Sequence, residues 1–305
     1  MILNSSLARK GDALGKRGAP LALLFLLTVS LAGFAHEAHN CFPSRAPQAF
    51  AIIPQERVTE TEMRAIFQAL SAMHGQEIAA HGGFLRVFET EKMEFGAFAW
   101  REHSDYAIEV YRGTRFHKLM TADAYALIVC HEFGHHLGGL PLKRLSSWAS
   151  AEGQADYYGS LKCMRRYLES RPPGDFDLAP PPPLELTARC QQEFDRPLDV
   201  RICARALAAT RTLGEVTADI EGFERSRFPT LETNSPLVVI ENRDSHPDPQ
   251  CRLDTLRAGT LCPVPATEAV SYGDPDAGVC HMRRHPQHRR PPCWFLSVDP
   301  EVRPI

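Results

Sequence analysis

A short stretch near the middle of the chain, ALIVCHEFGHHLGG at residues 126–139, restricts the possible folds more than any other part of the sequence. The two closing glycines are a common end of a helix. On a helix, side chains four positions apart share a face, so His131 and His135 would point the same way, with Glu132 beside them. Two such imidazoles can bind a metal ion, and the carboxylate can act as a base. The stretch therefore predicts a helix that carries part of a metal site.

Two histidines need a third protein ligand to form a catalytic metal site, in which a fourth position stays open for water. A pattern that continues with a histidine six residues after His135 is excluded, because that residue is Pro141. The side chain of His136 would point about 100° away on the helix. The stretch SAEGQADYYG offers Glu152 and Asp156 on one face of a second helix. Glu152 is predicted as the third ligand, and Asp156 as the acceptor of the free N–H of a ligating histidine.

The combination of HExxH with ExxAD is similar to the HtpX-like and CAAX-prenyl-protease-like zinc metallopeptidases, which are gluzincins. GAFAW at residues 96–100 resembles the NAFA segment of that family. DSHPDPQCRLDTLRAG at residues 244–259 resembles its THPxxxxRI segment. These four segments, GAFAW, HExxH, ExxAD and DSHPDPQCRLDTLRAG, follow one another in the same order as in the family. The chain departs from the family at Gly96, where the family has asparagine, and no segment matches the family's membrane helices.

The resemblance implies an α+β, zincin-like metallopeptidase fold. In that fold a small β-sheet lies over the HExxH helix and a second helix carries the glutamate. It implies a Zn²⁺ ion held by three ligands, His131, His135 and Glu152. Asp156 is expected to support a ligating histidine, and Arg252, which matches a family position, would pair with Asp156, with Glu152 or only with solvent.

The function that these expectations favour is a zinc-dependent endopeptidase acting on exported or envelope proteins. Glu132 would take a proton from the attacking water, and His246 would help to stabilise the oxyanion. Two other functions stay open: a non-catalytic zinc-binding module that recognises misfolded envelope proteins, and a zinc amidase that acts on cell-wall peptides. A protein or peptide substrate would add to the sheet edge along four residues, Gly96, Ala97, Phe98 and Ala99.

The N-terminus predicts export. Basic residues precede an apolar run that ends at Ala35, and Gly33 and Ala35 are the small residues expected before a signal-peptidase cut at His36. The run is shorter than the roughly 20 residues that a membrane anchor requires, and no other segment could span a bilayer. We therefore expect a signal peptide over residues 1–35 and a single zincin-like peptidase domain over residues 36–305, in a periplasmic or secreted protein.

All nine cysteines lie beyond the predicted signal peptide, so disulfides are expected, chiefly among residues 190 to 293. Because nine is odd, at least one thiol is left over or pairs with a cysteine of another molecule. If the two helices run antiparallel with Glu152 level with the histidines, Cys130 and Cys163 lie about 12 Å apart. A disulfide requires Cα atoms within about 7 Å, so Cys130 is predicted to be a buried free thiol.

The net charge of −3 and the lack of nucleic-acid-binding motifs give no reason to expect a nucleic-acid partner. The one concentrated basic segment is CHMRRHPQHRRPPC at residues 280–293. It reads as a solvated disulfide loop. The alternative is that residues 281–290 form a docking patch for an anionic envelope partner, such as glycan or lipid headgroups.

Apolar periodicity and turn signals predict the other elements. Thr59 and Glu62 form a capping box at the start of a helix within residues 59–82. The remaining expectations are strands at 84–89, 96–101 and 106–111, one helix over 151–168, a Pro-rich loop at 171–183, helices near 185–194, 198–213 and 249–258, and a Cys-rich C-terminal extension at 260–305.

Overall fold

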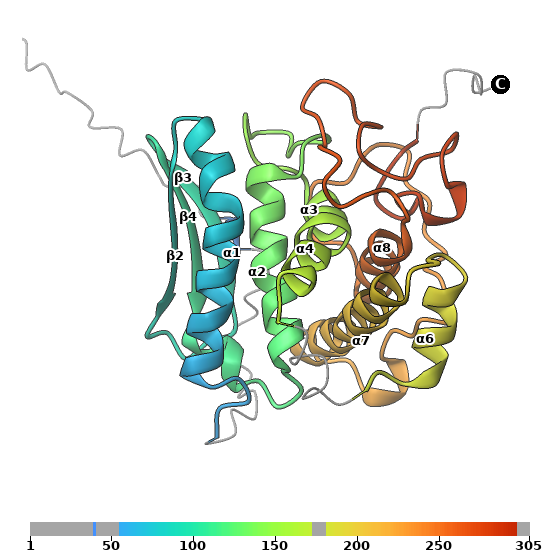
Figure 1. Cartoon of the computed structure of the whole chain (residues 1–305), viewed down its shortest axis with the longest axis horizontal. Coiled ribbons are helices and arrows are strands. Elements are labelled where there is room, and N and C mark those ends of the chain that lie inside the picture. Colours follow the sequence, from blue (N-terminus) through green and yellow to red (C-terminus); the bar gives the residue numbers. More distant parts are fainter. Residues whose placement is uncertain (1–38, 41–54, 173–180, 298–305) are drawn as a thin grey trace, which may run out of the picture. The chain divides into compact units, whose positions relative to one another are not determined.

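The computed structural model describes residues 39–40, 55–172 and 181–297, which belong to one compact unit. A mixed β-sheet stands beside a set of helices in this unit, so the predicted α+β class is confirmed (Figure 1). The predicted signal peptide lies outside the described residues, as do parts of the Pro-rich loop and of the C-terminal extension. Within the described ranges, no helix is both long and apolar enough to cross a membrane.

The sheet contains β1 (His39–Asn40), β2 (Phe84–Thr90), β3 (Ala97–Glu102) and β4 (Asp105–Tyr111), in the order β1-β3-β4-β2. Strand β4 pairs antiparallel with β3 and parallel with β2. Ile108 and Val110 are fully buried because alternate residues of β4 face the helices. The three strands predicted from the sequence are confirmed to within one residue at each end.

Helix α1 (Glu60–Ala80) packs against the sheet beside α2 (Figure 1). The predicted capping box is present. The backbone N–H of Glu62 donates to Thr59 Oγ1 at 3.2 Å, and the backbone N–H of Thr59 donates to Glu62 Oε2 at 2.8 Å. The apolar face of the helix is buried, as its spacing predicts; it includes Met63, Ile66, Phe67 and Leu70.

Helix α2 (Ala122–Leu137) lies between the sheet and the following helices (Figure 1). The hydroxyl of Thr121 caps its N-terminus by accepting a hydrogen bond from the backbone N–H of Ala124 at 3.2 Å. Every residue from Ala124 to Leu137 is buried. Polar side chains in such a helix must find partners inside the protein. These side chains are His131, Glu132, His135 and His136.

The predicted second helix is three consecutive elements: α3 (Glu152–Tyr158), a π-helical turn η2 (Gly159–Cys163) and α4 (Met164–Glu169). It approaches α2 at two glycines. A Cβ atom on Gly134 would lie 2.5 Å from the carbonyl oxygen of Ala155, and one on Gly159 would lie 3.1 Å from the backbone nitrogen of His131. Glycine is needed at Gly134 because any side chain would collide with the α3 backbone.

The prediction that Cys130 is a free thiol is wrong, because it forms a disulfide with Cys163, with the Cα atoms 5.4 Å apart. The predicted separation of about 12 Å assumed that Glu152 is level with His131 and His135. In the structure, Gly159 lies against Cys130 and His131, so α3 begins beyond His135. Cys163 is one turn past Gly159 and therefore reaches Cys130, while the length of the Glu152 side chain spans the offset.

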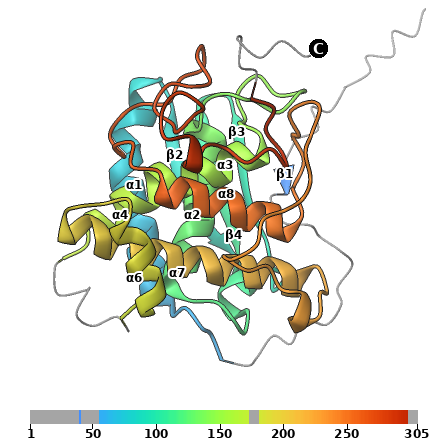
Figure 2. The same ribbon diagram turned by 90° about the vertical axis from the view of Figure 1, so that its right-hand side faces the viewer.

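The remaining helices are α6 (Leu184–Gln191), α7 (Pro197–Ile220) and α8 (Pro249–Leu261). Helices α7 and α8 pack on one another, α7 against α2 and α8 against α3 (Figure 2). Helix α7 extends past its predicted end because its apolar spacing continues, with Leu213, Val216 and Ile220 buried. Short 3₁₀ turns complete the described helices: η1 (Arg112–Phe116), η3 (Arg225–Arg227) and η4 (Pro286–His288).

Three further disulfides confirm the prediction for the C-terminal half. They join Cys190 to Cys203, Cys251 to Cys293, and Cys262 to Cys280. The first joins α6 to α7, and the other two fasten the C-terminal extension to α8. The ninth cysteine, Cys41, lies outside the described residues.

Candidate metal centre

Helices α2 and α3 bring three potential metal ligands together. One ligand atom from each of His131, His135 and Glu152 lies within 4.8 Å of the others. Each of these residues is at most 1% exposed. The sequence-predicted ligand set therefore converges at one buried point, where it could hold a metal ion.

The carboxylate oxygen Oε2 of Glu152 is the centre of this cluster. It lies 3.2 Å from Nε2 of His131 and 3.6 Å from Nε2 of His135. It is buried and, within the described part of the chain, no hydrogen bond to it has standard geometry. Burial alone would raise the pKa of Glu152, but His246, His135 and His131 hold it well below its usual range. Glu152 is therefore ionised and suited to bind a cation.

The other ring nitrogen of each histidine is occupied, which fixes the tautomers. Nδ1 of His135 lies 2.8 Å from the carbonyl oxygen of Ser150, which can only accept, so Nδ1 carries the proton. Nδ1 of His131 lies 2.7 Å from Oδ1 of Asp156. Burial lowers the pKa of His135 to about 4, so this imidazole is neutral and presents the lone pair of Nε2 to the centre.

Asp156 is held between His131 and Arg252. The guanidinium of Arg252 donates to Oδ2 at 3.0 Å through Nε and to Oδ1 at 2.8 Å through Nη2. Burial would raise the pKa of Asp156, but Arg252 and His131 lower it to about 2. Burial likewise lowers the pKa of His131, yet Asp156, Glu152 and Glu132 together raise it to about 9. The centre thus favours positive charge, and a divalent cation could replace the proton.

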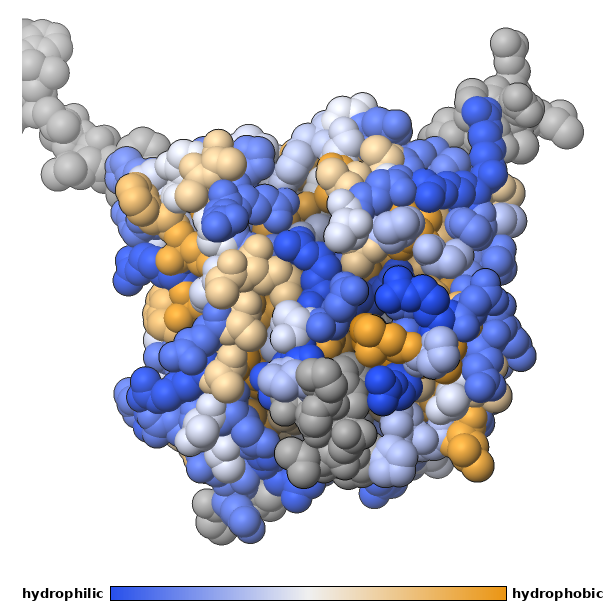
Figure 3. Space-filling view, in the orientation of Figure 1, coloured by the Kyte–Doolittle hydropathy of each residue, from blue (hydrophilic) through white to orange (hydrophobic). Residues whose placement is uncertain are grey.

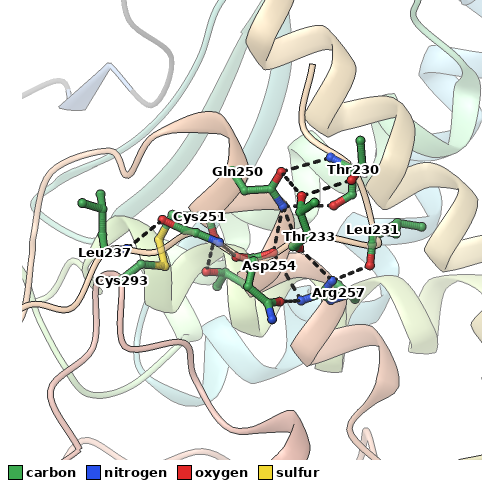
Figure 4. A network of polar contacts seen from close by, with 12 residues as sticks. Thr230, Leu231, Thr233, Leu237, Gln250, Cys251, Asp254, Arg257 and Cys293 are labelled. Carbon is green, nitrogen blue, oxygen red and sulfur yellow. Dashed lines mark hydrogen bonds and ion pairs between the residues drawn. A yellow bond between two sulfur atoms is a disulfide. The ribbon is translucent and has the colours of Figure 1, made fainter. Parts of the chain in front are cut away.

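Arg252 lies on α8, and this helix is held by contacts with residues 230–235 (Figure 4). Asp248 caps the helix by accepting hydrogen bonds from the backbone N–H groups of Gln250 and Cys251, both at 3.1 Å. The side chain of Gln250 donates to Thr230 O at 3.0 Å, and Asp254 Oδ2 accepts from the Ser235 backbone N–H at 2.6 Å. The Cys251–Cys293 disulfide adds a covalent tie. Arg252 therefore meets Asp156 from a fixed helix.

Lys143 is a site residue that the sequence analysis missed. Its Nζ donates to Oε1 of Glu152 at 2.6 Å, and the Lys143 side chain is 10% exposed. The same loop supplies Ser150, the acceptor for His135, and the backbone N–H of Lys143 donates to Ala149 O at 2.8 Å. Lys143 lies nine residues before Glu152, in an irregular loop. No sequence motif predicts the contact, because it depends on the path of that loop. Lys143 occupies Oε1, so that Oε2 faces the histidines.

His246 and Glu132 both lie where the sequence predicts site residues. Nε2 of His246 is 3.2 Å from Oε2 of Glu152, and its side chain is 22% exposed, so it stands at the solvent side of the cluster. Glu132 is fully buried on α2 between the two histidine ligands. Its charge contributes to the raised pKa of His131. The catalytic roles of both residues stay predictions.

The predicted substrate strand has a neighbour from the chain itself. Phe98 and Ala99 of β3 pair with Asn40 and His39 of β1. An added peptide could therefore pair with these two residues only if β1 moved away. The predicted role of Gly96, Ala97, Phe98 and Ala99 in substrate binding stays a prediction.

Much of the basic segment 281–290 is used internally. Arg284 pairs with Glu268 through two bonds of 2.8 and 3.1 Å. Arg290 is 2% exposed and donates to Leu140 O and Gln154 Oε1, both at 3.2 Å. These contacts join the segment to the loop after α2 and to α3. The docking of an anionic partner stays a prediction. Arg284 and Arg290 are engaged within the protein, so fewer than four arginines of this segment could contact such a partner.

Comparison of the chain with models of protein families, with curated proteins and with solved structures finds no match.

Proposed function

We propose that this protein is a zinc-dependent endopeptidase with a zincin-like fold, similar to the HtpX-like and CAAX-prenyl-protease-like gluzincins. The observation that carries the proposal is the convergence of Nε2 of His131, Nε2 of His135 and the carboxylate of Glu152 at one buried point. Two imidazoles and one carboxylate form a ligand set of catalytic zinc sites, in which a fourth position remains for water or substrate.

The donors suit zinc in charge as well as in type. Both Nδ1 atoms are engaged by acceptors, so both Nε2 atoms are available as ligands. The ionised Glu152 contributes one negative charge, and Asp156 supports His131 without being among the three converging ligands. When bound, zinc would supply Lewis acidity, which polarises a carbonyl and makes a water molecule acidic near neutral pH.

The residues of the chain have distinct parts in the proposed reaction. Glu132 takes a proton from the water that attacks the scissile carbonyl and passes it to the leaving amine. His246 stands at the solvent side and can donate a hydrogen bond from its ring to the developing oxyanion. Lys143 holds Oε1 of Glu152, and Asp156 holds the ring of His131.

We infer that the natural substrates are proteins or peptides of the cell envelope or the exterior. Four disulfides are typical of a chain from an oxidising compartment. Together with the signal peptide predicted over residues 1–35, they support a periplasmic or secreted location.

Digestion of casein by the purified mature chain tests the proposal. We expect about one zinc per molecule, cleavage that a chelator abolishes, and recovery of cleavage when zinc is restored. The matched control is Glu132→Gln, which should retain zinc but lose most turnover, because an amide cannot take the proton.

Two outcomes would count against an endopeptidase, and a third would count against the role of Glu132. Zinc binding without cleavage of casein or a peptide library would favour the non-catalytic module. Cleavage of cell-wall peptides alone would favour the amidase. Wild-type turnover by Glu132→Gln would show that the proposed base is wrong.

A further inference from the structure

A cavity of about 640 Å³ opens away from the metal centre, and none of the metal-site residues lines it. Its walls come from the C-terminal end of α1, the β3–β4 hairpin, the end of α2, helices α3 and α4 with the π-helical turn between them, and the loop 266–272. Figure 3 shows a mixture of hydrophilic and hydrophobic residues on the face where Figure 1 draws α1 and α4. The volume falls in the range of small-molecule sites, roughly 300–1,000 Å³.

Basic side chains outnumber acidic ones in the lining. The lining cations are Arg101, Lys162 and Arg166, and the lining carboxylates are Glu77 and Glu268. Both carboxylates already have partners. Glu268 is bound by Arg284 at 2.8 and 3.1 Å, and Glu77 lies 3.5 Å from His74 Nδ1 and 3.9 Å from Arg166 Nη1. The cavity therefore keeps a surplus of positive charge.

Lys162 is the most unusual of these cations. It is 2% exposed, and its Nζ donates to a neutral acceptor, the carbonyl oxygen of Pro265, at 2.7 Å. Within the described residues, no carboxylate forms an ion pair with it. Burial lowers its pKa to about 7; the charge of Glu268 opposes this shift, and those of Arg165, Arg284 and Arg166 add to it. An anion in the cavity would offset the cost of a buried ammonium group.

Arg101, a third lining cation, is fixed by contacts on several sides. Its guanidinium lies 3.9 Å from the ring centre of Tyr106 and 4.7 Å from that of Trp148. Its Nε donates to Nδ1 of His136 at 3.3 Å, and its Nη2 donates to the His136 carbonyl oxygen at 2.8 Å. A cation fixed in this way adds a positive potential to the cavity with little loss of side-chain freedom on binding.

Apolar and aromatic residues form another part of the wall: Tyr106, Leu137, Tyr158, Val270 and Tyr272. We propose that this cavity binds a small organic carboxylate, whose charged group lies beside Lys162 and Arg166 and whose apolar or aromatic body contacts the tyrosines. The proposal does not depend on the metal centre or on the proposed peptidase activity.

Titration calorimetry at constant ionic strength tests the proposal, with benzoate as the probe and benzamide as its uncharged counterpart. The wild-type protein should bind benzoate and bind benzamide at least 10-fold more weakly. Lys162→Met and Arg166→Gln should each weaken benzoate binding at least 10-fold. The control is Lys118→Met, which removes the same charge from an exposed lysine outside the cavity and should leave binding unchanged.

Nuclear magnetic resonance of the Lys162 side chain gives a second readout that a merely structural role would not move. Saturating benzoate should raise the pKa of Lys162, because the carboxylate stabilises the ammonium form. If Lys162→Met does not fold, Arg166→Gln carries the test, since its side chain is 30% exposed. The proposal would be overturned if the wild type did not bind benzoate, or if Lys162→Met and Arg166→Gln bound benzoate as tightly as Lys118→Met does. It would also be overturned if phosphate bound as tightly as benzoate.

Discussion

Asp156 Oδ1 lies 2.7 Å from Nδ1 of His131, on the side of the ring that faces away from Glu152. The same carboxylate receives both bonds from Arg252. Asp156, which lies on α3, thus links α2 to α8. It fixes the angle of the His131 ring and raises the basicity of Nε2.

The first prediction concerns this carboxylate. Asp156→Asn keeps the shape but removes the charge that binds both His131 and Arg252, so we expect zinc affinity to fall about 10- to 100-fold. Competition against a chelator measures the change. Asp276→Asn, at a half-exposed aspartate outside the centre, is the control and should bind zinc like the wild type. Equal affinities for the two variants would remove Asp156 from the support of the site.

The second prediction concerns Lys143. Lys143→Met leaves Oε1 of Glu152 without its ammonium partner, so the carboxylate can turn, and we expect zinc affinity to fall by about 10-fold. Lys143→Arg should restore most of the affinity because a guanidinium can also donate to Oε1. The spectrum of the cobalt-substituted protein reports the ligand geometry directly. A wild-type spectrum and affinity in Lys143→Met would show that the lysine does not position Glu152.

The third prediction concerns Gly153, which follows Glu152 on α3. A Cβ atom there would lie 2.2 Å from the indole ring of Trp294, so Gly153→Ala forces the two segments apart. We expect the free energy of unfolding to fall by about 1–3 kcal/mol. Gly75→Ala is the matched control: apart from its own helix backbone and chain neighbours, no atom lies within 4 Å of the added Cβ, and the change should raise helix stability by about 0.5–1 kcal/mol. Urea unfolding of both variants measures the contrast, and a shift of the same sign in both would contradict it.

The fourth prediction concerns pH and Lys162. Its folded-state pKa of about 7 lies below the ordinary value of 10.5, so the unfolded chain holds more protons between these two pH values. The stability of the wild type should therefore rise with pH across this window, whereas Lys162→Met lacks this contribution. The variant should gain most relative to the wild type at or below pH 7, and the gain should shrink toward pH 10. Urea midpoints at about pH 6, 8 and 10 measure it. A constant difference would mean that Lys162 titrates normally.

Local chemistry made much of this structure predictable from the sequence. The capping box of α1 depends on two residues three positions apart, so sequence and structure agree closely there. The face shared by His131 and His135, and that shared by Glu152 and Asp156, follow from helical spacing alone. His246 and Arg252 were expected only from the family resemblance, because nothing local joins them to residues about 100 positions earlier.

The errors arise where one element meets another. The sequence could not give the axial offset between α2 and α3, and the Cys130–Cys163 disulfide depends on that offset. Lys143 reaches Glu152 through an irregular loop, whose path no periodicity describes. The pairing of β1 with β3 joins distant segments, so the strand pattern at residues 96–101 did not reveal that Phe98 and Ala99 have a neighbour.

The order of the parts along the chain has a consequence for when the centre can form. The ribosome makes the HExxH helix and Glu152 first, His246 and Arg252 later, and Trp294, which packs over Gly153, later still. Before α8 is made, Asp156 has no guanidinium partner, and a buried carboxylate without one is costly. A nascent chain would therefore carry the complete HExxH motif while lacking a finished centre. The proposed hydrolysis would therefore have to wait until α8 has been made.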